Sequence, residues 1–268
     1  MSESPDPILA EARDTTRRVA RTFSLACRLL PREVRDDVYR LYLVFRTLDD
    51  LVDFGDPRAD DRLAAVEEWC AGAPPRSREA QLLAELDSRY ALPRDALIDF
   101  CRGMRGDLAG TPIYTEDELN EYCYRVAGTV GVTMAALLGS DDLDGARPSA
   151  AALGMAMQRT NILRDIDEDL ANGRIYLAQE TIDRYGSFAP GQRAALLRDQ
   201  IDRADALYRE GIAGIPLLHT GRRAIRAAAQ MYREILRQIE REGYGRHAGR
   251  VVVPRSRKVF VAVRAAGM

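Results

Sequence analysis

A short stretch near the middle of the chain, residues 158–177, crowds acidic side chains beside apolar ones and reads QRTNILRDIDEDLANGRIYL. At 3.6 residues per helical turn, its two amides and two of its carboxylates fall on one helix face. A glycine extends this face toward the amino end and leaves room for a ligand to approach. The residues that share the face are Gly154, Gln158, Asn161, Asp165 and Asp169. Asp167 and Glu168 point elsewhere.

A second stretch, YLVFRTLDDLVD at residues 42–53, repeats this arrangement. Tyr42, Arg46, Asp49 and Asp53 again lie on one helix face that ends in two carboxylates four residues apart. Asp50 lies about 100° away from them around the helix. The chain therefore carries two matched stripes, each with an arginine or amides next to paired carboxylates.

Paired carboxylates on a helix repel each other by a few tenths of a kcal/mol, so two such pairs need a reason. A single acidic pair is usually a solvated helix face. Both stretches, however, carry apolar residues around most of their circumference, which predicts burial. Mg²⁺ binds carboxylate oxygens and keeps water and substrate phosphates as its other ligands. We therefore expect two acidic helices that hold divalent cations, and through them a diphosphate.

Helical periodicity dominates the rest of the chain, and no convincing alternating strand is present. We predict one all-α domain over residues 1–268, with a short disordered N-terminus at 1–7. Thr115 and Glu118 form a capping box ahead of one helix, and GSDDLDGARPS predicts a loop before another. The expected helices are 8–29, 32–53, 59–71, 77–90, 93–109, one from about 116 to 138, 149–171, 189–213 and 217–243, with a short C-terminal segment.

Composition narrows the class of protein. The net charge of −2 gives no reason to expect a nucleic-acid partner. The four cysteines are far apart and form no CxxC pair, which indicates buried thiols in a reducing compartment. The polar N-terminus is no signal peptide, and no apolar run is long enough to span a bilayer, so we expect a cytoplasmic chain. Residues 246–268 hold six Arg or Lys and no acidic residue. This segment is either a solvated tail that partly closes the active site or a peripheral contact with the inner membrane face.

The motifs together resemble the phytoene synthase/squalene synthase family, the head-to-head prenyl transferases. The resemblance runs from about Arg21 to Lys258 and contains five motifs in the family's order. They are RTFSLA (21–26), RTLDDLVD (46–53), YCYRVAGTVG (122–131), QRTNILRDIDEDLANGRIYL (158–177), and YREILRQIEREGY (232–244) followed by RVVVPRSRK.

The resemblance implies an isoprenoid synthase fold, a bundle of helices around a deep central cavity. Asp49 and Asp53 would face Asp165 and Asp169 across its mouth and bind Mg²⁺, with Mn²⁺ as a substitute, and Asn161 would assist. The implied diphosphate contacts are Arg46, Arg164 and Arg250, with Arg246 as the alternative to the last. The implied upper-cavity residues are Tyr42, Tyr122 and Tyr232. The catalytic residues are expected to be Tyr122, Tyr232 and the four aspartates. The implied substrate-binding residues of the tunnel are Phe23, Ala127, Val130, Gly131 and Gly154, with Gln158 just below the metal site.

Several of these residues also have a simpler interpretation. Tyr122 could belong to an ordinary aromatic pair, and Gly131 and Gly154 could be sites of close helix packing. Asp107 matches a family position near the site but carries no argument alone. The chain departs from the family at Asp167, where glycine is usual, at Ala178, where proline is usual, and at Ala20.

The activity implied by the resemblance is Mg²⁺-dependent coupling of two prenyl diphosphates through a cyclopropylcarbinyl diphosphate. Two C20 substrates would give phytoene. Two C15 substrates would give squalene-type products, of which squalene itself requires NADPH. A terpene cyclase that ionises and cyclises a single prenyl diphosphate is the alternative activity. A helical scaffold protein with a degenerate site is the alternative from another class.

Overall fold

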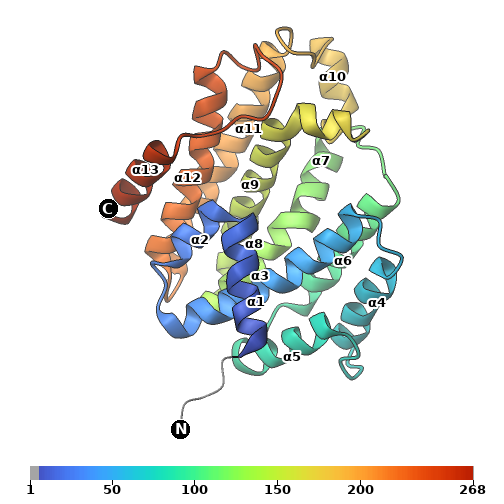
Figure 1. Ribbon diagram of the computed structural model, residues 1–268, viewed down its shortest axis with the longest axis vertical. Coiled ribbons are helices and arrows are strands. Elements are labelled where there is room, and N and C mark those ends of the chain that lie inside the picture. Colours follow the sequence, from blue (N-terminus) through green and yellow to red (C-terminus); the bar gives the residue numbers. More distant parts are fainter. Residues whose placement is uncertain (1–5, 268) are drawn as a thin grey trace.

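The computed structural model describes residues 6–267, which form helices joined by short loops (Figure 1). Within this range the single β-type contact is an isolated bridge between Ser140 and Leu218. The all-α class expected from the sequence is confirmed. The helices are α1 (Pro7–Val19), α2 (Arg21–Cys27), α3 (Arg32–Asp53), α4 (Ala59–Cys70), α5 (Arg78–Tyr90), α6 (Arg94–Leu108), α7 (Glu116–Cys123), a π-helical segment (Tyr124–Gly128), α8 (Thr129–Leu138), α9 (Leu143–Ala171), α10 (Gln179–Tyr185), α11 (Ala194–Ala213), a 3₁₀ turn (Ile215–Leu217), α12 (Arg222–Arg241) and α13 (Arg255–Gly267).

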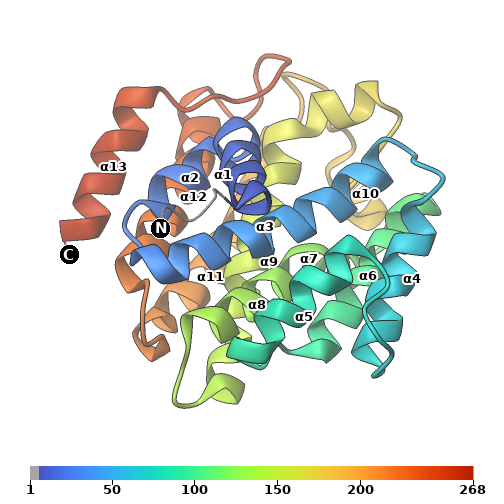
Figure 2. The same ribbon diagram turned by 60° about the horizontal axis from the view of Figure 1, so that its bottom comes forward.

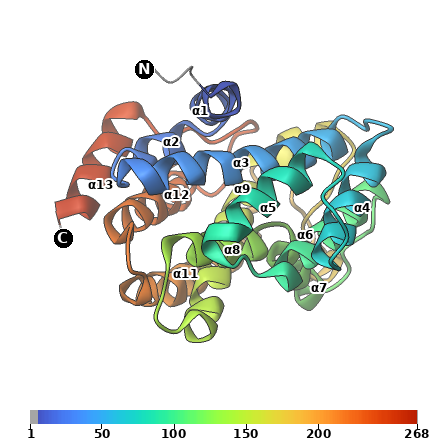
Figure 3. The same ribbon diagram turned by 90° about the horizontal axis from the view of Figure 1, so that it is seen from below.

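The long helix α9 lies in the middle of the molecule and packs against α8, α11 and α12 (Figure 1). Helix α3 packs against α1 on one side and against α5, α6 and α8 on others (Figure 3). Helices α13 and α4 lie at opposite ends of the molecule in all three views (Figure 2). The two acidic stretches lie on α3 and α9, whose partner helices differ except for α8, so they belong to two helix layers.

Two separate apolar clusters hold these layers. One gathers buried side chains of α3 to α6 around Leu41, Leu63 and Leu83. The other gathers those of α9, α11 and α12 around Leu163 and Tyr208, which is completely buried. Burying such side chains supplies the main driving force for folding. Helix α3 thus packs in the first cluster and most of α9 in the second, with Leu143 and Ala150 of α9 also packed against the first.

Several predicted boundaries are correct. Helix α3 has the bounds expected from the sequence. The predicted capping box is confirmed: the Thr115 hydroxyl accepts from the Glu118 N–H at 3.1 Å, and the Glu118 carboxylate accepts from the Thr115 N–H at 3.0 Å.

Other boundaries differ. The single helix expected over 8–29 is two helices, because the backbone turns at Ala20 (φ −114°, ψ 59°). Asp6 and Pro7, which we predicted as part of a disordered N-terminus, form the cap and first residue of α1, and residues 1–5 lie outside the described range. The loop predicted over GSDDLDGARPS is wrong after Asp142. This side chain caps the Gly145 N–H at 2.8 Å and starts α9 despite Pro148.

Candidate active site

A cavity of about 460 Å³ lies between α3 and α9 and is lined by residues of both layers. Most of the residues predicted from the sequence line it. They are Phe23, Tyr42, Arg46, Asp49, Ala127, Val130, Gly131, Gly154, Gln158, Asn161, Arg164, Tyr232 and Arg250. Asp53, Asp165, Asp169 and Tyr122 are not among the lining residues. Asp165 contacts the lining residues Arg164 and Arg250, and the charge of Asp53 acts on the lining residue Asp49. Asp169 and Tyr122 contact other residues, Arg174 and Asp107.

The cavity is apolar except where the two acidic helices meet it. Phe45 and Phe100 form part of the wall, with their ring centroids 4.7 Å apart in an edge-to-face arrangement. Met134, Leu138 and Leu218 line the same space. An apolar cavity with polar groups at one side is typical of a site for an amphiphilic ligand.

Two of the predicted glycines bring helices close together at this cavity. A Cβ atom at Gly131 would lie 2.2 Å from the carbonyl oxygen of Ala150, and one at Gly154 would lie 2.1 Å from that of Ala127. The simpler interpretation, close helix packing, is therefore correct for both residues. Because both also line the cavity, the packing shapes its wall. The π-helical segment Tyr124–Gly128 lies beside this contact, and π-segments recur at functional sites.

The acidic end of α3 is held by an arginine of the same helix. Arg46 donates to Asp49 at 2.8 Å and also to Asp50. Partial burial raises the pKa of Asp49 to about 7, and repulsion from Asp53 adds to the shift. The Tyr42 ring lies beside the Phe23 ring, with centroids 5.5 Å apart. Helix α3 thus presents a poorly solvated carboxylate above an aromatic wall.

The acidic end of α9 collects arginines from more than one segment. Arg164 donates to both oxygens of Asp165, at 2.8 and 2.5 Å. Arg250, on the segment after α12, lies 3.2 Å from Asp165 and 2.9 Å from Glu168. Arg250 rather than the alternative, Arg246, therefore reaches the acidic end. Partial burial raises the pKa of Asp169 to about 6, and the charge of Asp165 adds to the shift.

Arg174, which the sequence analysis did not select, joins the two acidic helices. Its backbone N–H donates to the carbonyl oxygen of Asp169 at 2.8 Å, after a turn in which Gly173 has φ +74°. Its side chain donates to Asp53 at 2.7 Å and to the Tyr176 hydroxyl at 3.2 Å. A signal was available, because Arg174 and Tyr176 lie within the same quoted stretch.

Tyr122 belongs to a polar group at the same side of the site. Its hydroxyl donates to Asp107 at 3.2 Å, and its ring stacks on Tyr176 with centroids 5.4 Å apart. Partial burial raises the pKa of Asp107 to about 6. Asp107 is therefore part of the site, which the sequence alone did not establish. The aromatic pairing of Tyr122 is with Tyr176 and not with its neighbour Tyr124.

Lys258, the single lysine of the chain, adds a further positive charge near Arg164 and Arg250. Partial burial lowers its pKa, and the charges of Arg164, Arg21 and Arg250 lower it further. Like charges gathered in this way are costly unless an anion neutralises them. From this basic segment the sequence predicted Arg250 at the site, but not Lys258.

The donor atoms at the mouth fit a hard divalent cation. The Oδ1 atom of Asn161 is buried and has no hydrogen-bond partner, although its Nδ2 atom donates to Gln158 at 3.3 Å. An orphaned carbonyl oxygen beside carboxylates is a ligand set that suits Mg²⁺. Within residues 6–267, however, no three acidic, His or Cys side chains are already gathered for a metal. In the structure these carboxylates pair with arginines, Asp49 with Arg46, Asp53 with Arg174 and Asp165 with Arg164.

Comparison with known proteins gives a consistent class. The sequence model of the family "Squalene/phytoene synthase" matches residues 16–257. The chain is 39% identical to a phytoene synthase of Thermus thermophilus over 241 residues, which is 83% of this chain and 80% of the relative. It is 34% identical to a 15-cis-phytoene synthase of Synechococcus elongatus, over 93% of this chain and 89% of the relative.

Solved structures agree with the sequence relatives. A dehydrosqualene synthase in complex with a ligand superposes with a TM-score of 0.88 at 28% identity, covering 97% of this chain and 95% of that one. A squalene synthase from Alicyclobacillus acidocaldarius, with a TM-score of 0.74 and 24% identity, covers 90% of this chain and 95% of its own and supports the fold.

The fold and the acidic, arginine-lined mouth define a prenyltransferase that acts on prenyl diphosphates. Within that class, the chain belongs to the squalene/phytoene synthase family.

Proposed function

We propose that this enzyme couples two molecules of geranylgeranyl diphosphate head to head to form phytoene. The observation that carries the proposal is the apolar cavity of about 460 Å³ that opens beside Asp49, Arg46 and Arg164. The identity to two phytoene synthases supports the C20 substrate over a C15 one. Dehydrosqualene or squalene formation from two C15 substrates is the second candidate, supported by the likeness to a dehydrosqualene synthase.

Binding begins with the diphosphate. Arg46, Arg164 and Arg250 donate to its oxygens, and planar guanidinium groups suit this role because they bind phosphate with two hydrogen bonds. Asp49, Asp53, Asp165 and Asp169, with the free Oδ1 atom of Asn161, would hold Mg²⁺, or Mn²⁺ in its place. When bound, the metal supplies Lewis-acid neutralisation of the leaving diphosphate.

The chain then controls the allylic cation that remains after the C–O bond breaks. The apolar wall with Phe45, Phe100 and Met134 excludes water and prevents hydrolysis of the cation. The C2=C3 bond of the second substrate attacks it, which forms a cyclopropylcarbinyl diphosphate with loss of one proton. Loss of the second diphosphate, rearrangement and loss of a second proton give phytoene, with no reductant required.

Asp107 and Tyr122 are suited to take up a proton at this stage. The hydroxyl of Tyr122 is hydrogen-bonded to the Asp107 carboxylate at 3.2 Å. With its pKa raised to about 6, Asp107 is mostly ionised at neutral pH and still basic enough to accept a proton. Tyr232 lines the cavity from α12 and is the second tyrosine we assign to the catalytic group.

Product analysis by mass spectrometry tests this function. Purified protein would receive Mg²⁺ with farnesyl or geranylgeranyl diphosphate, with and without NADPH, and EDTA would replace Mg²⁺ in the control. The proposal expects a C40 hydrocarbon from geranylgeranyl diphosphate without NADPH, and none with EDTA. A C30 hydrocarbon would support the second candidate. A cyclic C15 or C20 product would show instead a terpene cyclase built from the same two helices.

We also propose that α13 rests on an anionic membrane surface, which would suit a lipid-soluble product. Val259, Phe260 and Val263 are 52%, 56% and 68% exposed on this helix. No helix in the described range is both long and apolar enough to cross a bilayer. Basic residues near an anionic surface each gain about 1 kcal/mol. In liposome flotation, the protein should float with anionic vesicles and dissociate at high salt. Flotation that ignores lipid charge, or no flotation, would contradict this.

A further inference from the structure

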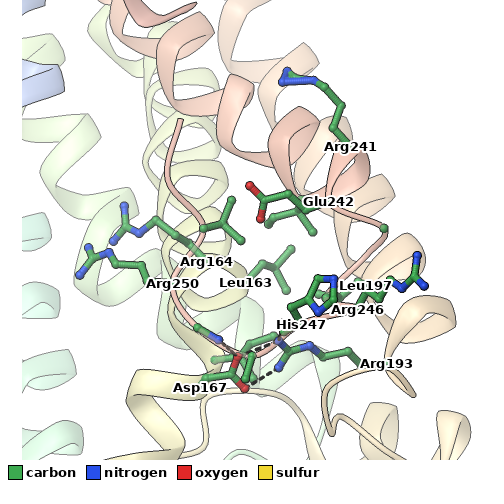
Figure 4. Close-up of a pocket in the computed structure, with 17 residues that line it drawn as sticks. Leu163, Arg164, Asp167, Arg193, Leu197, Arg241, Glu242, Arg246, His247 and Arg250 are labelled. Atoms are coloured by element: carbon green, nitrogen blue, oxygen red, sulfur yellow. Dashed lines mark hydrogen bonds and ion pairs between the residues drawn. The ribbon is translucent and has the colours of Figure 1, made fainter. Parts of the chain in front are cut away.

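Asp167 lies on a face of α9 turned away from Asp165 and Asp169 and has partners of its own. Its two carboxylate oxygens accept from Arg193 at 2.7 and 2.8 Å, as Figure 4 shows, and one of them also accepts from the Gly249 N–H at 2.7 Å. Only 18% of the Asp167 side chain and 4% of the Arg193 side chain are exposed. The pair is therefore a buried, three-way connection between α9, the start of α11 and the segment after α12.

The segment that this pair holds, residues 243–251, has no helix of its own. Its backbone passes through positive φ values at Gly243, Tyr244, Gly245 and Gly249. Two charged side chains hold the backbone of residues 246–249 in the described part of the chain. Asp167 accepts from the Gly249 N–H, and Arg193 donates to the His247 carbonyl at 3.3 Å. Backbone hydrogen bonds flank this stretch, from Gly191 to the Gly245 carbonyl at 3.0 Å and from Val251 to the Arg164 carbonyl at 3.5 Å. Asp167 and Arg193 thus hold the part of the segment that lies between these bonds.

Arg250 follows directly on the held residue. It is 46% exposed and reaches back to Asp165 at 3.2 Å and to Glu168 at 2.9 Å. In Figure 4, Arg250 lies beside Arg164, while Arg246 and His247 lie on the opposite side, near Arg193. The long and flexible side chain of Arg250 can remain at the cavity mouth only if its backbone is fixed. Two backbone groups next to Arg250 are held: Gly249 donates to Asp167 at 2.7 Å, and Val251 donates to the Arg164 carbonyl at 3.5 Å. The bond to Asp167 is the shorter and charge-assisted one, so it supplies the main anchor.

We infer that Asp167 and Arg193 are positioning residues, which hold segment 243–251 so that Arg250 reaches the diphosphate at the mouth. The inference rests on the proposed function in one respect, that Arg250 binds a diphosphate. Asp167 itself would touch neither substrate nor metal, because its carboxylate is occupied by Arg193 and Gly249 on the other side of α9.

The test is a double-mutant cycle of Asp167→Asn and Arg250→Ala in the full-length chain. The affinity for inorganic pyrophosphate, measured by calorimetry with Mg²⁺ present, is the main readout, and the KM and kcat for geranylgeranyl diphosphate are the second. We expect Asp167→Asn alone to weaken pyrophosphate binding by about tenfold, as loss of a charge-assisted contact does, and to raise KM more than it lowers kcat. In the Arg250→Ala background the same change should alter binding by less than about twofold, since Arg250 is already lost.

A matched control separates positioning from general stability. Glu79 is a buried carboxylate that accepts both of its bonds from Arg62 at 2.7 Å, outside the cavity. Glu79→Gln should lower the melting temperature without changing pyrophosphate affinity. Hydrogen exchange of the peptide 243–251 should rise in Asp167→Asn and stay unchanged in Glu79→Gln.

Each outcome decides between the two claims. The positioning role is overturned if the losses of pyrophosphate affinity caused by Asp167→Asn and Arg250→Ala multiply in the double variant. It is also overturned if Asp167→Asn leaves that affinity unchanged. If Asp167→Asn does not fold, Arg193→Lys carries the same test, because lysine keeps the charge but cannot bind both oxygens. A third result is that Asp167→Asn weakens pyrophosphate binding only when Arg250 is present, while the unmodified enzyme turns over no prenyl diphosphate. That result would support the positioning role and overturn the proposed reaction.

Discussion

The two acidic helices neutralise their carboxylate charges with arginines from different parts of the chain. On α3, the charge of Asp49 is met by Arg46 three residues earlier on the same helix. On α9, Asp165 is met by its neighbour Arg164 and by Arg250, which lies on a distant segment. The pairing of Asp49 is therefore local, whereas that of Asp165 depends on tertiary structure. Arg174 connects them by placing its guanidinium on Asp53.

Removing a carboxylate from either helix should have the largest effect. We expect Asp49→Ala and Asp165→Ala each to lower kcat/KM by roughly 10³-fold, a size typical of losing a group that stabilises transition-state charge. The helical circular dichroism spectrum should be unchanged, since neither side chain belongs to the apolar clusters. Equal loss of helical signal and activity would instead make these aspartates structural.

Removing the arginine between the two helices should have a smaller and opposite effect on metal affinity. Arg174 occupies Asp53 at 2.7 Å, and it must compete with a cation for this carboxylate. In Arg174→Gln, the Mg²⁺ concentration for half-maximal diphosphate release should fall by about threefold, the size of an exposed ion pair. Arg102→Gln, which removes a comparable pair with Asp99 on α6, serves as the control. An unchanged or higher Mg²⁺ requirement would refute the competition.

The smallest expected effect concerns the pH dependence of stability without metal. Burial raises the pKa of Asp49 to about 7, whereas the pKa of an aspartate in the unfolded chain is about 3.9. The folded state therefore retains this proton to higher pH. The contribution of Asp49 to stability is complete below about pH 4 and is lost as the pH rises through about 7.

Asp49→Asn cannot ionise, so it should raise the melting temperature of the EDTA-treated protein at about pH 8. Because the side chain is partly exposed, we discount the effect to about 1 kcal/mol, or roughly 2–4 °C. Little change is expected at about pH 4. Thermal melts at both pH values check the prediction. An equal change in melting temperature at both would show that the variant does not act by removing a poorly solvated charge.

The features that the sequence predicted are those that depend on local contacts, and the ones it missed depend on distant contacts or on a single backbone conformation. The bounds of α3, the stripe Tyr42–Arg46–Asp49 and the capping box at Thr115 depend on neighbours within one or two turns, and the sequence predicted them. The break at Ala20 and the helix start at Leu143 depend on a single backbone conformation and a single cap, which periodicity does not detect.

The site shows this limit more clearly. Asp167 could be interpreted from the sequence only as an extra charge, because its partners Arg193 and Gly249 are far away along the chain. Asp107 has the same difficulty, since its role depends on contact with Tyr122. Ala178, which replaces a proline usual in the family, keeps a φ of −63°, the value that proline would impose. The substitution therefore leaves the local backbone in the same conformation.

The most direct test of the central claim, that the two acidic helices serve one cavity for head-to-head coupling, is a stoichiometry. Diphosphate released and hydrocarbon formed would be measured together, with geranylgeranyl diphosphate and Mg²⁺. Head-to-head coupling gives two diphosphates for each C40 product. One diphosphate for each C20 product would mean that a single substrate is ionised and cyclised, which would rule out head-to-head coupling.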